Sequence, residues 1–371
     1  MLSLYVHIPF CRKRCPYCDF YLVTGTGRME EFFRALHEET ASKAGLLKGR
    51  RIGAVHFGGG TPSQAPARLI AGWLDQVSGI GVLESGAEVT LEANPEDALH
   101  LGEYSAAGIN RLSLGVQSFS ERKLRSLGRA HAADEAARAV EDALRLFRSV
   151  SVDLICGAPG EDLSEWQGDV RRAVELAPNH ISVYMLSLEP KTILHRDVRS
   201  GRTAVPGEEL QAACYRHAQE ALPAAGLAQY EISNFALEGH RSRYNLSSWR
   251  REPYLGFGPA AHSFVRLEDG EVRSANTASL SGYLRDPRSA EGFREVLTER
   301  ERFTEEVFLA LRINRGLDVG FLRKGHKLGH RLESAIREFD AKGWLFERDG
   351  RLFLTSEGFL FADLIAEAFI P

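Results

Sequence analysis

Three cysteines follow an apolar run directly in the stretch LYVHIPFCRKRCPYC at residues 4–18. The run Leu4–Ile8 predicts a buried strand, and Pro9 ends it because proline cannot donate to a strand ladder. The cysteines then lie on a loop at the carboxyl end of a strand, where α/β barrels gather their chemistry. Thiolates this close together can share one metal centre, and we assign that role to Cys11, Cys15 and Cys18.

The number of cysteines distinguishes two kinds of metal site. Thiolate iron–sulfur sites normally take four cysteines, whereas this motif offers three, with Asp19 and Phe20 where a nearby fourth could stand. One iron would be left open to a small molecule. The alternatives are a structural zinc site with a distant fourth ligand, or three buried thiols. Zinc sites usually combine two separated ligand pairs, and no second pair follows here.

This CxxxCxxC motif, with an aromatic residue before its last cysteine, resembles the signature of the radical S-adenosylmethionine (SAM) superfamily. Further stretches resemble one family within it, the oxygen-independent coproporphyrinogen oxidases and HemW-type heme chaperones, in order and spacing. They are HFGGGTPS (56–63), LEANPED (91–97), LSLGVQSF (112–119), DLICGAPGE (153–161) and YEISNFA (230–236). The resemblance spans nearly the whole chain.

Length, charge and hydropathy limit the possible classes. The 371 residues can bury a sizeable core and indicate one large domain with a smaller companion. A net charge of −4 argues against a general nucleic-acid binder. No signal peptide and no transmembrane run is evident, so we expect a cytoplasmic protein. Five cysteines, three of them clustered, do not form a disulfide framework, and Cys156 and Cys214 are predicted to be buried thiols.

Six apolar runs recur every roughly 30 to 40 residues, with helical patterns between them. The runs cover 4–8, 52–57, 88–93, 111–116, 151–156 and 181–186, and the helical patterns include 29–47, 68–77, 134–147 and 208–222. This cadence is typical of an α/β fold with parallel strands. Six units predict a partial (β/α)6 barrel over residues 1–225, open on one side for a large substrate, and the family resemblance implies the same barrel.

Polar residues stand at or near the end of each run. They are the cysteines, Gly58–Thr61, Glu92 with Asn94, Gln117 with Ser118, Asp153, and Ser187 with Glu189. Each alone could merely turn the chain. Because parallel strands share one carboxyl face, we expect all of them to converge on one pocket.

The family resemblance implies which of these residues hold SAM. Gly59, Gly60 and Thr61 would receive the amino group of its methionine moiety. Tyr5 and Tyr17 would flank the adenosyl group and the cluster, and further contacts would come from Glu92, Gln117, Arg129 and Asp153. These charges suit a sulfonium ligand with a ribose, an ammonium and a carboxylate. The alternative for Arg129 is a solvated place in the basic segment 122–129.

Residues 226–293 are rich in glycine and aromatic side chains and are predicted to form a loop-rich extension and pocket wall for a flat ring. The alternative is an ordinary aromatic core beneath long loops. The chaperone branch carries an HNxxYW motif proposed to serve heme, and here YNLSSW (244–249) replaces its histidine and tyrosine. The candidate heme residues are therefore His240, Tyr244, Trp249 and His262.

Residues 294–371 are predicted to form a small winged-helix-like domain. Helical patterns at 305–311 and 330–342 lead to Asp349-Gly350 between two alternating apolar runs, which is a strong hairpin signal. Acidic residues are interspersed with the basic ones, so we expect this domain to cover the barrel rather than to bind DNA.

Three functions compete. The first is a HemW-type heme chaperone that holds heme, a four-iron, four-sulfur cluster and SAM, and transfers heme to an unidentified acceptor protein. The second is an oxygen-independent coproporphyrinogen III oxidase, which uses an electron to cleave SAM. The third is a nucleic-acid binder with a structural metal.

Two features favour the chaperone. Phe20 replaces the last cysteine of the oxidase CxxxCxxCxC motif, and Tyr5 lies near the chain start, where the oxidase has an amino-terminal arm. We therefore expect no oxidase activity and no nucleic-acid partner. An electron donor would be needed only if SAM is cleaved. We assign no catalytic residue.

Overall fold

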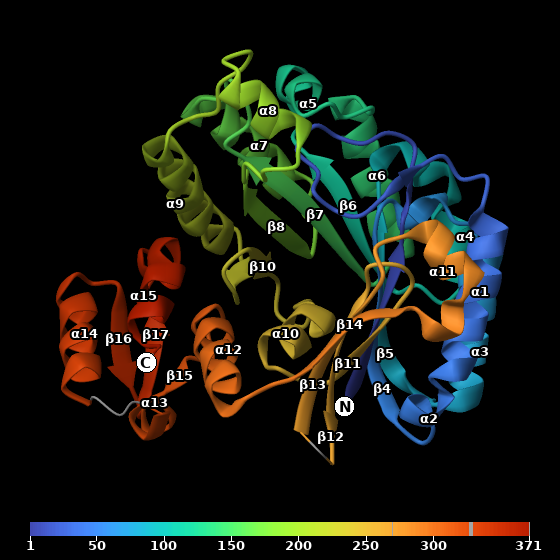
Figure 1. Ribbon diagram of the computed structural model, residues 1–371. Helices are drawn as coiled ribbons and strands as arrows, with labels where there is room; N and C mark the ends of the chain where they lie inside the picture. Colours follow the sequence, from blue (N-terminus) through green and yellow to red (C-terminus); the bar gives the residue numbers. More distant parts are fainter. Residues whose placement is uncertain (269, 326–328, 371) are drawn as a thin grey trace.

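The computed structural model describes residues 1–268, 270–325 and 329–370, which form a curved α/β barrel and a smaller carboxyl-terminal unit (Figure 1). Six parallel strands make the barrel, and each pairs with the next in chain order. They are β1 (Leu2–Ile8), β4 (Arg51–Gly59), β5 (Val82–Ala93), β6 (Arg111–Gln117), β7 (Ser149–Cys156) and β8 (His180–Met185). The predicted partial (β/α)6 barrel is thereby confirmed.

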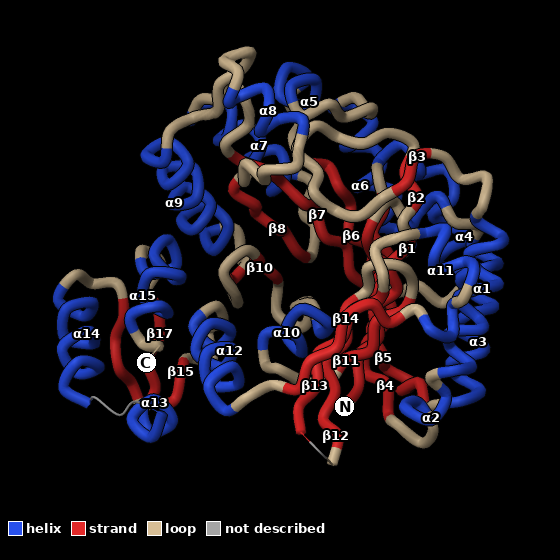
Figure 2. The backbone as a smooth tube through the Cα atoms, in the orientation of Figure 1, coloured by secondary structure: helices blue, strands red, loops and turns tan. Residues whose placement is uncertain are grey.

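Helices cover the outer face of this curved sheet (Figure 2). They are α1 (Met29–Ser42), α2 (Ala44–Leu47), α3 (Ala67–Ile80), α4 (Leu101–Ala106), α6 (Ala133–Leu146), α7 (Leu163–Glu175) and α9 (Glu208–Ala224). The short helices α5 (Glu121–Ser126) and α8 (Ile193–Arg199) lie at the carboxyl end of the strands, where the Leu194 amide of α8 donates to the Pro16 carbonyl at 2.9 Å. Cys156 on β7 and Cys214 on α9 are fully buried in the core beneath the covering helices, as predicted.

The two faces of the barrel strands differ in chemistry because successive side chains of a strand point to opposite faces. On β1, Leu4 and Val6 are fully buried in the hydrophobic core. Tyr5 and His7 lie on the other face and contact each other inside the barrel. The interior is therefore polar, and the apolar side chains face the helices.

The sheet continues beyond both ends of the parallel set. Past β1 it adds β11 (Tyr254–Phe257), β12 (His262–Leu267), β13 (Gly270–Asn276) and β14 (Glu291–Val296), and past β8 it adds β10 (Asn234–Ala236) and β9 (Ala228–Gln229). The resulting twelve-stranded sheet has free edges at β14 and β9 and does not close. Helices α10 (Arg243–Trp249) and α11 (Leu280–Arg285) complete this region.

This region is more regular than the loop-rich extension that the sequence predicted. Strand β14 is exposed along almost its whole length, so it lacks the alternation that identifies a half-buried strand. In β11 a glycine, Gly256, interrupts the apolar pattern because a Cβ there would lie only 2.1 Å from the carbonyl oxygen of His262. Neither strand therefore carries a clear sequence signal.

The carboxyl-terminal unit contains helices and a three-stranded sheet. Its elements are α12 (Glu299–Leu311), β15 (Leu317–Asp318), α13 (Val319–Gly325), α14 (Gly329–Ala341), β16 (Leu345–Arg348), β17 (Arg351–Leu354) and α15 (Ala362–Ala368). The predicted hairpin is present, with Asp349 and Gly350 both at positive φ between β16 and β17.

This unit packs beside the barrel. Arg216 on α9 forms an ion pair with Glu357, and Glu231 forms a β-bridge with Ile313. The unit therefore covers the β8–β10 side of the barrel, whereas the sequence only predicted that it covers the barrel. Among the described residues, no helix combines the length and apolar character needed to span a bilayer.

A buried ion network joins the loops that follow β6 and β7. Lys123 on α5 contacts the carboxylates of Glu161 and Asp169, and all three side chains are excluded from solvent. Asp169 accepts hydrogen bonds from the Ser118 hydroxyl at 2.7 Å and the Phe119 amide at 2.6 Å. Since each loop supplies at least one member, the network fixes the two loops relative to each other.

We expect Lys123→Ala to lower the free energy of unfolding by about 3 to 5 kcal/mol, because it leaves two carboxylates buried without their cation. Urea denaturation followed by circular dichroism measures this change. Arg145→Ala is the matched control, because Arg145 pairs with Asp142 on the exposed surface and should contribute at most about 1 kcal/mol. Equal losses in the two variants would contradict a structural role for the network.

Candidate cluster and cofactor site

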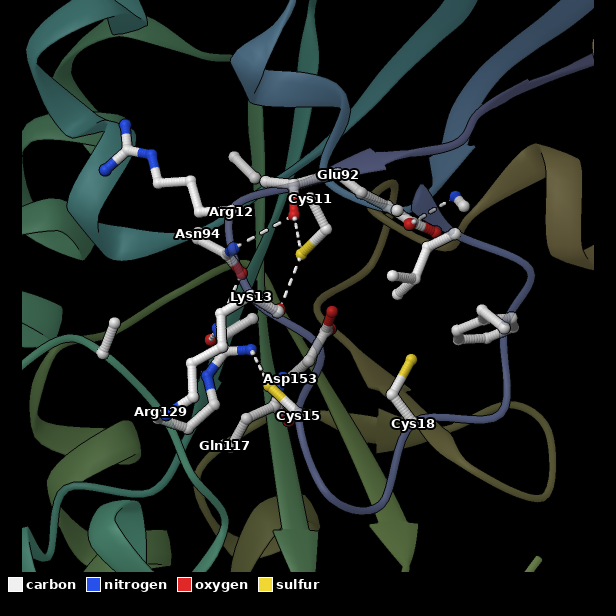
Figure 3. A pocket seen from close by; sticks show the side chains of 18 of the residues that line it. Cys11, Arg12, Lys13, Cys15, Cys18, Glu92, Asn94, Gln117, Arg129 and Asp153 are labelled. Carbon is white, nitrogen blue, oxygen red and sulfur yellow. Dashed lines mark hydrogen bonds between the residues drawn. The ribbon is translucent and has the colours of Figure 1, made fainter. Parts of the chain in front are cut away.

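A cavity of about 360 Å³ opens at the carboxyl ends of the parallel strands (Figure 3). Its wall comes from the loops after β1 and β4 and from the ends of β5, β6, β7 and β8. All predicted cluster and SAM residues except Tyr5 line it, namely Cys11, Cys15, Tyr17, Cys18, Gly59, Gly60, Thr61, Glu92, Gln117, Arg129 and Asp153. The structure thus brings residues from six segments of the chain to one place.

The cysteine loop is held from both ends and from within. At its start, β2 (Phe10–Cys11) pairs with β3 (Val23–Thr24). Inside the loop, the guanidinium of Arg14 donates to the carbonyls of Cys18 at 3.2 Å and Leu22 at 3.2 Å. These bonds shape the loop without using any thiol, so the sulfur atoms stay available for ligands.

The three thiols are free and partly exposed at the cavity mouth. The Thr61 hydroxyl donates to the Cys11 sulfur at 3.1 Å, and the Arg129 guanidinium lies 3.7 Å from the Cys15 sulfur. Burial raises the pKa of the Cys18 thiol, and the neighbouring cysteines add to this effect. Burial therefore favours the neutral form of the Cys18 thiol.

The spacing of the thiols bears on the choice between zinc and a cluster. In the described part of the chain, no group of three or more Cys, His, Asp or Glu side chains is arranged to hold a single metal ion. A structural zinc ion needs four ligands around one point. An iron–sulfur cluster takes each thiolate on a different iron, so the three thiols of this loop match three irons of one cluster.

The glycine run at the end of β4 packs directly on the cysteine loop. The amides of Gly60 and Thr61 donate to the carbonyls of Ile8 and Phe10 at 2.9 and 2.7 Å. A Cβ at Gly60 would lie 2.5 Å from the Phe10 carbonyl oxygen, so no larger residue fits. Since these amides are used by the fold, the run can offer a ligand acceptor oxygens, which suit an ammonium group.

Two carboxylates face the cavity from neighbouring parts of the barrel. Asp153 on β7 accepts from the hydroxyls of Ser113 at 2.9 Å and Ser151 at 3.0 Å. Burial raises the pKa of Asp153 although these hydroxyls oppose the shift. Glu92 on β5 accepts from the Gly59 amide at 3.2 Å. Both groups gain from a ligand that brings hydroxyl or ammonium donors.

Gln117 and Arg129 also line the cavity, and Gln117 does so from a strained backbone position. Gln117 has φ +66° and sits in a tight turn closed by the Ser118 amide on the Val116 carbonyl at 2.8 Å. The Arg129 guanidinium donates to Asn94 at 2.6 Å and to the Gly115 carbonyl at 2.7 Å. The bonds from Ser118 and Phe119 to Asp169 support the Gln117 turn, so the buried network helps to shape the cavity.

Tyr5 lies deeper in the barrel than the cavity that was predicted to include it. Its ring stacks on His56 at 6.0 Å and on Tyr244 at 5.9 Å between centroids. Glu92 separates this aromatic group from the cavity, because its second carboxylate oxygen lies 2.9 Å from the His56 Nε2 atom. Sequence reasoning missed His56, although strand alternation from Gly58 would have pointed it inward.

The four heme candidates fall in three different places. Tyr244 and Trp249, both on α10, are partly exposed, and Trp249 lies within reach of the Glu231 carboxyl. His240 bonds Ser149 at 2.7 Å, at the amino end of β7 and thus opposite the cavity. His262 is exposed at the start of β12. The structure therefore brings Tyr244 close to Tyr5 but does not bring His240 to the cavity.

Glu231 is a second residue that sequence reasoning missed, since YEISNFA served only as a family stretch. Its side chain is fully buried, and it accepts from the Ser233 amide at 3.1 Å. Its Oε1 atom has no hydrogen-bond partner among the described residues. Burial raises the pKa of Glu231 to about 7. The carboxyl group is therefore poised to gain or lose a proton near neutral pH.

Comparisons with known proteins agree with this geometry. Residues 5–173 match the Radical SAM superfamily, and residues 297–361 match the HemN C-terminal domain. The heme chaperone HemW of Bacillus subtilis is 34% identical over 385 residues, which cover 100% of this chain and 99% of that protein. The mitochondrial radical S-adenosyl methionine domain-containing protein 1 of Danio rerio is 40% identical over 326 residues, which cover 85% of this chain and 73% of that protein.

A solved structure shares the fold. Coproporphyrinogen III oxidase (HemN) from Escherichia coli, described as a radical SAM enzyme, superposes with a TM-score of 0.83 over 100% of this chain and 90% of that chain. The two are 22% identical, so the likeness concerns the fold alone.

The buried Glu231 predicts a pH-dependent stability. Its pKa is about 7 in the fold and 4.5 when unfolded, so the folded state loses stability as pH rises from about 4.5 to 7 and stays lower above it. Glu231→Gln removes this charge and should raise the free energy of unfolding by about 3 kcal/mol at about pH 8, with little gain at about pH 5.

Urea denaturation at both pH values measures the difference. The exposed Glu208→Gln serves as the control, because its carboxylate stays hydrated in both states. A gain from Glu231→Gln that is the same at both pH values would contradict titration of Glu231.

Proposed function

Because this chain belongs to the radical SAM superfamily and, within it, to the family of the HemW heme chaperones, we propose that it binds heme and transfers it to an acceptor protein. The observation that carries the proposal is the full-length match to the Bacillus subtilis chaperone. The position of α10 supports it, since the stretch that stands in place of HNxxYW directs Tyr244 toward Tyr5 in the barrel interior. We propose that this exchange takes place in the cytoplasm.

The cavity suits the two cofactors that the superfamily implies. Cys11, Cys15 and Cys18 would bind three irons of a four-iron, four-sulfur cluster, which would leave one iron open to a ligand in the cavity that the three cysteines line. Such a cluster, when bound, supplies the electron for reductive cleavage of SAM, and an electron donor is needed only if that cleavage occurs. The free thiols around one cavity mouth support this assignment.

The remaining lining residues would hold SAM by charge and by hydrogen bonds. Acceptor oxygens around Gly59, Gly60 and Thr61 suit its ammonium group, and Arg129 suits its carboxylate. The carboxyls of Glu92 and Asp153 suit ribose hydroxyls and the sulfonium charge, with Gln117 beside them. Tyr17 would flank the adenosyl group. Tyr5 would pack beneath the Glu92 side chain, on the side of it away from the cavity.

Each of the three parts of the chain would then have its own role. We propose that residues 1–225 form the barrel that carries cluster and SAM, and that residues 226–293 add the wall that faces heme. Residues 294–371 would then form a winged-helix-like unit beside the barrel, where its contacts with α9 stabilise the β8–β10 edge.

A coproporphyrinogen III oxidase is the second candidate, because the Escherichia coli enzyme shares the fold along the whole chain. Phe20 argues against it. It stands where the oxidase motif has its last cysteine, and its side chain is 65% exposed beside the cysteine loop. An exposed phenyl ring in place of a thiol would change which molecules can come close to the cluster from the solvent side.

Cluster and SAM binding can be separated by mutation. After anaerobic reconstitution, Cys15→Ala should lose the four-iron cluster, because no other free thiol of the loop can replace it. Asp153→Ala should keep the cluster but bind SAM about ten- to a hundredfold more weakly, since it loses charge-assisted contacts. Iron and sulfide analysis and calorimetric titration with SAM measure the two effects.

The buried Cys214 provides the control, and Cys214→Ala should retain both cluster and SAM affinity. Zinc as the sole metal found, or full iron content in Cys15→Ala, would rule out the cluster assignment.

Heme titration combined with an activity assay tests the chaperone proposal. The reconstituted protein should bind ferric heme stoichiometrically, with a Soret band, and should turn over no coproporphyrinogen. Trp249→Leu should weaken heme binding about three- to tenfold through loss of an aromatic contact. Phe346→Leu, on the exposed face of β16, should leave it unchanged. Repeated decarboxylation of coproporphyrinogen together with weak heme binding would favour the oxidase instead.

A further inference from the structure

We propose that a small cavity at the amino ends of β5, β6 and β7 binds an oxyanion of the phosphate type. This inference goes beyond the proposed heme function and does not depend on it. The cavity has a volume of about 100 Å³ and lies at the end of the barrel opposite the cysteine loop. Its wall contains four arginines, so we call it the basic cavity. They are Arg111, Arg148, Arg241 and Arg243.

Arg111 gives the basic cavity a fixed, buried donor. It stands at the start of β6, and its side chain is only 3% exposed. Its guanidinium donates to the His240 carbonyl at 2.9 Å. In the same wall, the Arg243 guanidinium donates to the Gly86 carbonyl at 2.6 Å. Since a guanidinium has five N–H donors, these bonds hold both groups in place and leave donors for a ligand.

The negative charge of the wall is too small to neutralise these arginines. Among the described residues that line the basic cavity, Glu88 is the one acid. Its Oε1 atom accepts from the amides of Arg243 at 2.9 Å and Tyr244 at 3.2 Å. Its Oε2 atom lies 3.8 Å from the Arg111 guanidinium. A single carboxylate cannot balance four guanidinium groups, so the cavity keeps a net positive charge.

The other three arginines have no acidic partner of their own. In the part of the chain that the structure describes, no carboxylate forms an ion pair with Arg148, Arg241 or Arg243. The excess positive charge also acts on the neighbouring His240. Burial lowers the pKa of His240, and Arg111 and Arg148 lower it further. A cleft lined by charge of one sign attracts ions of the opposite sign, so the basic cavity favours an anion.

The volume of the basic cavity limits the ligand to one small group. About 100 Å³ equals the space that about three water molecules fill in the liquid. A single phosphate group suits this space, whereas a tetrapyrrole or a nucleoside would stay outside it. Arginine also recognises phosphate through paired N–H donors. The ligand is therefore free phosphate, or the phosphate group of a small ester whose remaining part stays in solvent.

Calorimetric titration with inorganic phosphate tests the site on the reconstituted full chain. The ionic strength is held constant with chloride, because salt screens exposed charges. The wild type should bind one phosphate saturably. Arg148→Gln and Arg241→Gln should each bind it about tenfold more weakly, since each loses a charge-assisted contact. Both side chains are exposed, so both variants should fold, and circular dichroism checks this.

Arg145→Gln is the matched control, because Arg145 is an exposed arginine outside the basic cavity and should leave the phosphate affinity unchanged. Nuclear magnetic resonance of His240 adds a local measurement. Bound phosphate should raise the pKa of His240, because its negative charge offsets that of Arg111 and Arg148.

Phenyl phosphate and acetate determine the chemistry of the ligand. Tighter binding of phenyl phosphate than of inorganic phosphate would support an ester as the ligand, and the reverse order would support the free ion. Three results would overturn the inference: no saturable phosphate binding by the wild type, unchanged affinity in both Arg148→Gln and Arg241→Gln, or acetate binding as tight as that of phosphate. None of them bears on heme binding, so the proposed function would stand or fall separately.

Discussion

The carboxylate of Glu92 connects the two levels of the barrel interior. One oxygen accepts from the Gly59 amide at the cavity, and the other bonds His56 in the aromatic layer below. A carboxylate inside a barrel needs such partners, because burying a charge without them is costly. The position of this carboxylate also requires glycine at residue 58, since a Cβ there would lie 2.9 Å from the Glu92 Oε1 atom. The glycine run and the acid therefore require each other.

The upper rim depends on a second polar arrangement outside the cavity. Gln117 holds a positive φ that costs a non-glycine residue about 1 to 3 kcal/mol, and it persists only because its surroundings hold it there. The bonds from Ser118 and Phe119 to Asp169 provide that support, and Lys123 neutralises the acid. A buried ion network away from the ligand thus determines the shape of the site.

The sequence predicted the barrel well because each parallel strand buries a row of apolar side chains against the helices and is followed by a helical pattern, which gives a regular cadence. It also predicted the rim, because strand order alone brings strand ends together. It could not predict the depth of Tyr5, which depends on the register of β1 against β4. Nor could it find the pairing of His56 with Tyr244, since that contact depends on how α10 docks across the barrel. The sequence could not predict the position of His240 either, because the path of the chain after β10 places this residue at the amino end of β7.

The free edges at β9 and β14 give the barrel the mechanics of a split ring. In a closed barrel, ladder hydrogen bonds run around the whole circumference and fix its diameter. Here the ladder stops at the two edges, and α10 with the residue before it instead contacts β1 and the segment before β10, through Ser247 with Ser3 at 2.8 Å and the Ser242 amide with the Tyr230 hydroxyl at 3.2 Å. The ladder hydrogen bonds therefore fix the spacing of neighbouring strands in the described sheet, but no rung between β9 and β14 fixes the circumference of the barrel.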